Sequence, residues 1–363
     1  MRKIFAGVML AVLLCGSAGA DVVYTTDTGN VGLIKILSST SADFYGTQYT
    51  GVGSDSLLGS YWDSSATRIL IINKDSTTAS GDTALIFSPS DLTKPLQTAG
   101  KVLTGVYNAK AMAGSERGKS VFFVSDNKIS EFRTENFAAV RSYDYTPGGS
   151  INTIITGTYS IYATAKDAAS GDVLLEFDGQ LRDDVQNFTR VSAPSGVEAL
   201  SWLSGSRVAV GHASGVSVRR SGSFNLLASS DAAVKSICMD NGTGFYFAEQ
   251  SSSDDVYTTT LKHYSGGEVS TLFTSSTSKA CKVIRHESSN VLAAVIGDSL
   301  RLYNMKDDSL LGSYDASVLG GNPLSVAETS VSGDDGSSGS SGCSMSCLGV
   351  ILLAGCALII RRR

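Results

Sequence analysis

Short apolar segments typical of buried β-strands recur along the chain at a nearly regular interval. Successive segments begin 37 to 52 residues apart, at Val22, Ile69, Val121, Ile161, Val208, Phe245 and Val291. Glycine, serine and aspartate separate them from further strand-like segments, as expected at turns. A period of this length, with several strands in each unit, predicts a repeat architecture.

The last four repeats can each be divided into four strands, which we name a to d. The fourth repeat contains SINTIIT, SIYATA, DVLLEF and NFTRVS, with Gly157, Ser170-Gly171 and Asp178-Gly179 at the turns. Alternating apolar and polar positions occur beside wholly apolar runs, which is expected where sheets pack face to face. These repeats therefore predict the blades of a β-propeller.

The two ends of the repeat region complement one another. The first repeat has candidates for strands b, c and d but none for strand a, whereas residues 322–329 (NPLSVAET) form a strand candidate with no b-strand after it. Placing this last segment in the first blade closes the ring and removes an exposed sheet edge. The sequence thus predicts an all-β, seven-bladed β-propeller over residues 21–329, with N/C-terminal ring closure.

Over these residues the pattern resembles the YVTN and WD-repeat class of seven-bladed propellers. The resemblance is architectural, because the Gly-His and Trp-Asp signatures of WD repeats are missing and Trp62-Asp63 occurs once, at a strand end. A pair of β-sandwiches is the main competing fold.

Residues 1–20 have the three parts of a secretory signal peptide. Arg2 and Lys3 precede an apolar run from residue 4 to residue 14, and residues 18–20 (AGA) fit the small-x-small cleavage rule. Cleavage between Ala20 and Asp21 is expected. Cys15 leaves a lipoprotein signal as an alternative, although Leu14 differs from the small residue that such signals carry there.

The C-terminal end has a second targeting pattern. A Ser/Gly-rich linker at residues 330–342 precedes a tail at residues 343–363 that contains a short apolar run, predicted as a hydrophobic helix, and three terminal arginines. This tail resembles bacterial sorting tails of the Synerg-CTERM type. The resemblance implies a processing protease that cuts near Gly342-Cys343, and an anchor at Cys343.

Two further tail cysteines, Cys347 and Cys356, leave the processed residue open, and an uncleaved tail anchor is the simpler alternative. Both ends together predict an exported protein of the cell envelope or cell surface that meets the membrane through its tail.

Charge narrows the range of partners. The first 20 and last 21 residues hold five of the 29 basic residues and no acidic one, so the body carries 24 − 34 = −10 charges. Phosphate binding needs a basic face. Nucleic acid is therefore not expected as a partner.

The histidines and paired acidic residues do not form a local metal-binding motif. His212, His263 and His286 lie too far apart for a local metal motif, and we interpret each as a strand or turn residue. The acidic pairs at 254–255, 307–308 and 334–335 lack the spacing of a calcium loop and are interpreted as solvated turn residues. No cofactor, metal or catalytic residue is predicted. Strand-end groups such as Asp240, Arg285 and Glu287 could not be ranked as site residues.

Cys238 and Cys281 fall on the a-strands of successive blades. An oxidising compartment permits a disulfide, but their register places them roughly 10 Å apart along the strands, so free thiols are favoured.

Three functions remain open. The first is a surface-displayed module that binds a protein or glycan. The second is an extracytoplasmic hydrolase or lyase with a dispersed site in the propeller channel, and the third is a passive structural protein of the envelope.

Overall fold

The structure is a computed structural model. It describes residues 20–63, 65–74, 81–97, 100–115, 118–145, 149–157, 160–178, 188–204, 207–220, 222–240, 242–253, 256–277, 280–286 and 289–329. The predicted linker, the sorting tail with Gly342 and Cys343, and the signal peptide up to residue 19 lie outside this range.

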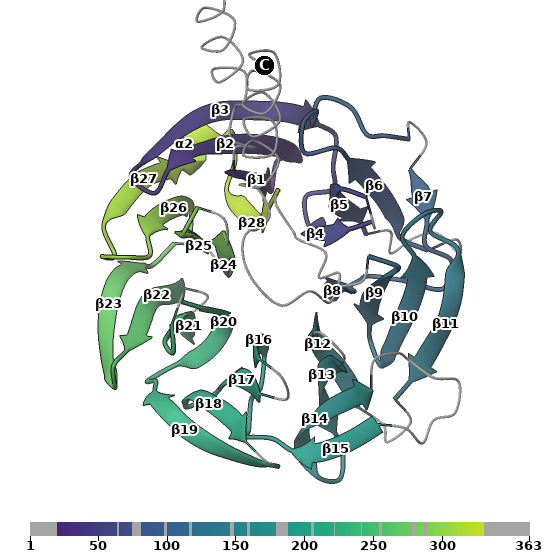
Figure 1. Ribbon diagram of the computed structural model, residues 1–363, viewed down its shortest axis with the longest axis vertical. Helices are drawn as coiled ribbons and strands as arrows, with labels where there is room; N and C mark the ends of the chain where they lie inside the picture. The colour runs from purple at the N-terminus through teal and green to yellow at the C-terminus, as the bar shows by residue number, and fades with distance from the viewer. Residues whose placement is uncertain are drawn as a thin grey trace, which may run out of the picture. The chain divides into compact units, whose positions relative to one another are not determined.

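The described residues form seven four-stranded antiparallel sheets arranged as blades round a ring (Figure 1). From the innermost strand outward, blade 1 contains β28 (Pro323–Glu328), β1 (Ala20–Thr26), β2 (Asn30–Ser38) and β3 (Ser41–Thr50). Blade 2 contains β4 (Leu57–Trp62), β5 (Thr67–Asn73), β6 (Thr83–Phe87) and β7 (Lys101–Val102). Blade 3 contains β8 (Ala111–Gly114), β9 (Ser120–Ser125), β10 (Lys128–Arg133) and β11 (Ala139–Asp144).

The remaining blades follow the four-strand division predicted from the sequence. Blade 4 contains β12 (Ser150–Thr156), β13 (Ser160–Asp167), β14 (Gly171–Asp178) and β15 (Phe188–Ser192). Blade 5 contains β16 (Ala199–Ser204), β17 (Arg207–His212), β18 (Gly215–Arg220) and β19 (Ser223–Ser229). Blade 6 contains β20 (Ala233–Met239), β21 (Phe245–Ser253), β22 (Val256–Ser265) and β23 (Glu268–Ser275). Blade 7 contains β24 (Cys281–His286), β25 (Val291–Ile296), β26 (Ser299–Asn304) and β27 (Leu310–Asp315).

The predicted ring closure is confirmed. β28 pairs antiparallel with β1, with Val22 opposite Glu328 and Tyr24 opposite Val326. The backbone N–H of Asp21 donates to Thr329 Oγ1, and the N–H of Thr329 donates to the Asp21 carbonyl, both at 3.0 Å. We call this pairing the seam. Seven blades, and not a pair of sandwiches, are the observed architecture.

The core lies between blades rather than inside any one of them. All seven apolar segments found in the sequence are the second strand of a blade, and in β25 every residue is buried. Such strands are covered on both faces, which explains why they read as continuous apolar runs. Among the described residues, each of the seven junctions between neighbouring blades holds one cluster of buried apolar side chains.

These junctions are not equally apolar. The cluster between blades 4 and 5 contains six buried apolar residues, whereas the other clusters contain nine to thirteen. Since apolar burial is the main favourable contribution to packing, the junction between blades 4 and 5 is the most weakly packed by this measure.

One element was not predicted. The helix α2 (Ala316–Leu319) follows β27, and the Asp315 side chain caps it by accepting from the N–H groups of Ser317 and Val318. β7 has only two residues.

Among the described residues no helix is long and apolar enough to cross a membrane. Cys238 and Cys281 are free thiols.

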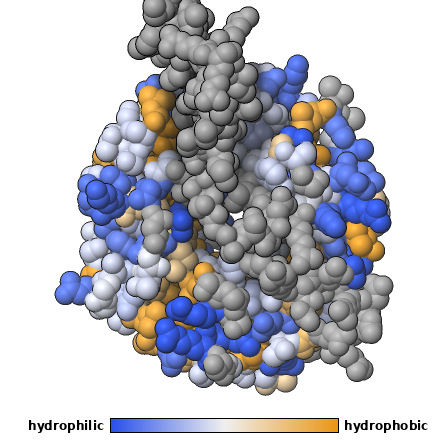
Figure 2. Space-filling view, viewed as in Figure 1, coloured by the Kyte–Doolittle hydropathy of each residue, from blue (hydrophilic) through white to orange (hydrophobic). Residues whose placement is uncertain are grey.

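The surface in view carries mostly polar residues. Figure 2 shows blue and pale residues over much of the coloured part of this face, with orange residues in separate patches. Scattered apolar residues of this kind are normal on soluble domains. This face therefore offers no single large apolar patch in its coloured part.

Candidate functional site

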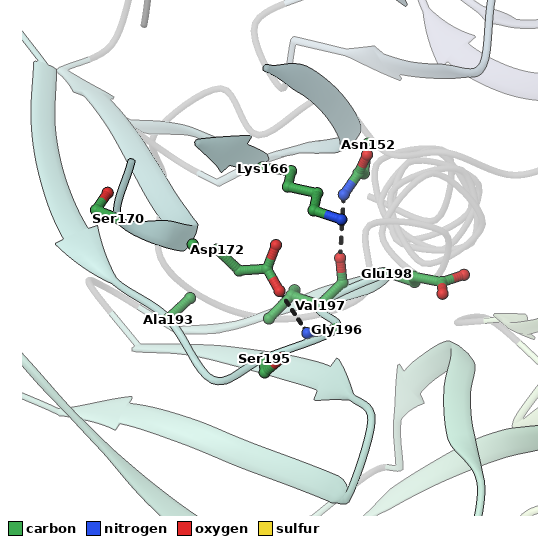
Figure 3. A pocket seen from close by; sticks show the side chains of 10 residues that line it. Asn152, Lys166, Ser170, Asp172, Ala193, Ser195, Gly196, Val197 and Glu198 are labelled. Carbon is green, nitrogen blue, oxygen red and sulfur yellow. Dashed lines mark hydrogen bonds between the residues drawn. The ribbon is translucent and has the colours of Figure 1, made fainter. Parts of the chain in front are cut away.

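A polar cavity lies at the junction of blades 4 and 5. It measures about 420 Å³ (Figure 3). It is lined by Asn152, Lys166, Ser170, Gly171, Asp172, Ala193, Ser195, Gly196, Val197 and Glu198. It therefore coincides with the junction that has the smallest apolar cluster, and its volume is within the usual range for small-molecule sites.

The turn between β13 and β14 forms one wall. Asp167 shapes this turn, because its Oδ1 accepts from the N–H of Ala169 at 2.7 Å and of Ser170 at 3.1 Å. Gly171 has a φ of 79°, a conformation that side chains rarely adopt. Arg190 on the outermost strand bonds to both Asp167 and Ser170. The wall is thus fixed by side chains from β13, from the turn itself and from β15.

The connection from β15 to β16 forms the opposite wall. The N–H of Gly196 donates to the Asp172 carboxylate, which ties this connection to the β13–β14 turn. Gly196 has a φ of 76°, and a Cβ there would meet the Cβ of Ala213 at 2.8 Å. Two different elements are therefore held face to face across the cavity.

The inner end of the cavity is set by two irregular strands. The ladder of β12 shifts register between Ile151 and Thr153, and Asn152 at this point donates from Nδ2 to the Val197 carbonyl at 3.4 Å. In blade 6 the ladder of β20 shifts between Val234 and Ser236, and Lys235 at this point pairs with Glu198 at 2.5 Å. β-Bulges commonly redirect side chains in this way.

The charged groups of the cavity differ in whether they have partners. Asp172 accepts from Gly196 and Glu198 is paired with Lys235. No hydrogen bond or ion pair joins the exposed Lys166 ammonium to another residue in the described part of the chain. Figure 3 shows Lys166 and Asn152 directed toward the segment that carries Val197 and Glu198. An ammonium without a partner among the described residues thus faces the polar cavity.

A second polar cluster lies between blades 6 and 7. His263 Nδ1 is 2.7 Å from Asp308 Oδ2, and Nε2 is 3.5 Å from Asp240 Oδ2. Tyr246 stacks on the imidazole at 4.0 Å and donates from its hydroxyl to Asp308 Oδ1 at 2.7 Å. Burial raises the pKa of Tyr246, so it stays a donor. Arg285 donates to the Asp240 carbonyl at 3.2 Å.

This cluster corrects one interpretation of the sequence. Asp307 is a solvated turn residue as expected, but Asp308 is not, because it joins blade 7 to His263 and Tyr246 of blade 6. Asp240 and Arg285, which the sequence did not rank, are brought together here. Glu287 and the acidic pairs at 254–255 and 334–335 lie outside the described residues.

The other two histidines are buried strand residues, as interpreted. His212 Nε2 is 2.9 Å from Ser217 Oγ, and both side chains are almost fully buried. This serine and histidine have the separation of a nucleophile and its base, but a substrate could not reach them. Burial lowers the pKa of His212, and it lowers the pKa of His286 to about 4. Within the described residues no group of three or more His, Cys, Asp or Glu side chains could hold a metal ion.

Sequence reasoning missed the cavity residues. Asp172 and Glu198 occur in the segments SGD and PSGVE, which look like ordinary turns, whereas Asn152 lies inside a strand candidate and Lys166 directly follows one. The one usable signal was an isolated charge at the end of an otherwise apolar strand, as for Lys166, but several other strands end in the same way.

Comparisons with known proteins agree with the fold. No family model matches the chain, and no curated protein matches it. A functionally unknown protein from Desulfotomaculum acetoxidans has a similar structure, with a TM-score of 0.54 and 10% identity over 85% of this chain and 99% of that one. The β-propeller domain of Myceliophteria thermophila Cps50 (Swd1) has a TM-score of 0.49 and 11% identity, over 72% of this chain and 86% of that one.

A chain of a nidogen/laminin complex has a TM-score of 0.48 and 9% identity, over 86% of this chain and 100% of that one. At these identities the likeness concerns architecture alone. The molecule is an all-β, seven-bladed propeller, a fold that is consistent with an interaction module.

Proposed function

We propose that this protein is an exported, surface-anchored binding module that holds a protein or glycan ligand at the cavity between blades 4 and 5. The observation that carries the proposal is the cavity itself. It combines six polar or charged side chains, a rigid frame of paired strands and the least apolar of the described junctions. Concave sites with converging polar groups are the usual places for recognition.

The binding proposal is tested by blocking the cavity. Ser195 lies exposed on the cavity wall, so Ser195→Trp fills it. Ser252 is an exposed serine of β21 and gives the matched control, Ser252→Trp. Full-length protein and both variants are screened against immobilised glycans and envelope proteins. Signals lost with Ser195→Trp and kept with Ser252→Trp support the proposal, and signals kept with both variants contradict it.

Export and anchoring form the second part of the proposal. We infer removal of residues 1–20, exposure of Asp21 as the first residue, and processing of the tail near Gly342 and Cys343, with the sorting protease and the membrane as partners. Asp21 bonds to Thr329, and the pairing of β1 with β28 runs from Val22 onward, so cleavage before Asp21 leaves these contacts in place. Intact-mass measurement of the surface form tests this. A C-terminus at Arg363 would leave a simple tail anchor.

A further inference from the structure

We propose that the cavity between blades 4 and 5 takes a uronic-acid sugar, with the sugar carboxylate on Lys166. The inference rests on the proposed binding function and adds the chemical class of the ligand. Three properties of the cavity lead to it: the charge without a partner, the hydrogen-bonding groups, and the scarcity of apolar lining.

The charge favours an anionic ligand. The carboxylates of Asp172 and Glu198 already have a backbone N–H and an ammonium as partners. Lys166 is exposed on the same cavity, and its ammonium has no hydrogen-bond acceptor or carboxylate partner within the described residues. A ligand carboxylate would give it a charge-assisted hydrogen bond, one of the stronger kinds in proteins. A cationic ligand would instead have to compete with Lys235 for Glu198.

The remaining lining requires hydroxyl groups. Ser170 and Ser195 present hydroxyls, and Glu198, whose side chain is 46% exposed, keeps acceptor capacity beyond its bond to Lys235. Asn152 uses Nδ2 on the Val197 carbonyl. Only Ala193 and Val197 have apolar side chains here. An apolar ligand would leave these polar groups unpaired, which costs binding free energy, whereas a polyhydroxylated ring pairs with them.

The experiment compares two sugars that differ in one group. Full-length protein is titrated with D-glucuronate and with D-glucose, and binding is followed by ligand-observed NMR. We expect glucuronate to bind at least tenfold more tightly than glucose. Lys166→Ala should weaken glucuronate binding at least tenfold, and Lys166→Arg should restore most of it. Lys94→Ala is the matched control, because Lys94 is exposed far from the cavity lining, at 78% for its side chain.

Each outcome decides one point. Equal binding of the two sugars, or no binding of glucuronate, overturns the ligand class. Unchanged binding by Lys166→Ala overturns the assignment of the carboxylate to Lys166. The proposed function fails separately, through the Ser195→Trp screen, which needs no particular ligand. Thermal melting of each variant excludes loss of fold as the cause.

Discussion

The junctions between blades 4 and 5 and between blades 6 and 7 both place charged side chains between neighbouring sheets, with opposite results. Between blades 6 and 7, His263 contacts Tyr246, Asp308 and Asp240, and the junction contains ten buried apolar residues, Tyr246 among them. Between blades 4 and 5, six buried apolar residues leave a cavity, and Lys166 faces it without a protein partner.

The difference shows that residue type alone does not identify a binding site. Buried polar groups in native proteins almost always have hydrogen-bond partners. Where neighbouring blades supply those partners, the cluster is part of the packing. Where they do not, water or a ligand must supply them. Changes to the charged side chains at the two junctions should therefore affect different properties: stability at blades 6 and 7, and binding at blades 4 and 5.

The largest expected effect is the loss of stability caused by Gly149→Ala. This variant tests whether the backbone beside Lys166 is rigid. A Cβ at Gly149 would lie 1.5 Å from the backbone oxygen of Lys166. The strand that carries Lys166 must then move, at a cost of about 3 kcal/mol of unfolding free energy. Chemical denaturation measures this loss, and Gly53→Ala is the control, because a Cβ at Gly53 would meet nothing closer than 3.6 Å.

Asp308→Ala should lower the free energy of unfolding nearly as much, because it disrupts the polar cluster between blades 6 and 7. It removes the hydrogen bonds from Tyr246 and His263, together worth about 2.5 kcal/mol after allowance for partial exposure. The neighbouring Asp307→Ala is the control, since Asp307 is exposed and contacts only its own turn. Equal destabilisation by the two variants in urea would mean that the cluster contributes no packing energy.

Acidification should weaken blade 7 through His286, which is fully buried in β24. Burial lowers its pKa from 6.5 to about 4, so the unfolded chain binds a proton more readily than the folded one. Stability from this residue is therefore present at pH 7 and falls by about 2 kcal/mol on going to pH 5. Asp21, whose pKa burial raises to about 6, acts in the opposite direction.

Because of this opposition, the useful quantity is the difference between the protein and its His286→Gln variant, measured by urea unfolding at both pH values. The variant should lose less stability than the parent by about 2 kcal/mol on acidification. The same loss in both proteins would show that His286 is already protonated at pH 7 or accessible to water.

The smallest expected effect on stability belongs to Lys166→Ala. Its ammonium has no partner among the described residues, so unfolding free energy should change by less than about 0.5 kcal/mol. Thermal melting tests this directly. A large loss would show that Lys166 holds the cavity together and would remove the contrast between the two junctions.

The fold could be predicted from sequence further than the site could. Runs such as VLAAVI are apolar because both of their faces are covered, so their spacing gives the blades directly. The α2 helix could not be read in this way, because four residues show no helical period and their order depends on the Asp315 cap.

The sites depend on contacts between distant residues. His263 and Asp308 are 45 positions apart, and no local pattern connects them. Lys166 belongs to a site only because the β15–β16 connection lines the same cavity. Spacing predicts which strand a residue occupies, but it does not predict which partners the neighbouring blade offers.

The seam has a consequence for the order of folding. Asp21 and Thr329 are bonded across 308 positions of the chain, and closing a flexible loop of that length costs roughly 5 kcal/mol of entropy before any contact compensates for it. Blades 2 to 7 need only contiguous chain, so they can form first and shorten the effective loop. The blade that begins the chain is therefore the last to be completed, and until the final strand arrives β1 presents a bare edge on which another strand could pair.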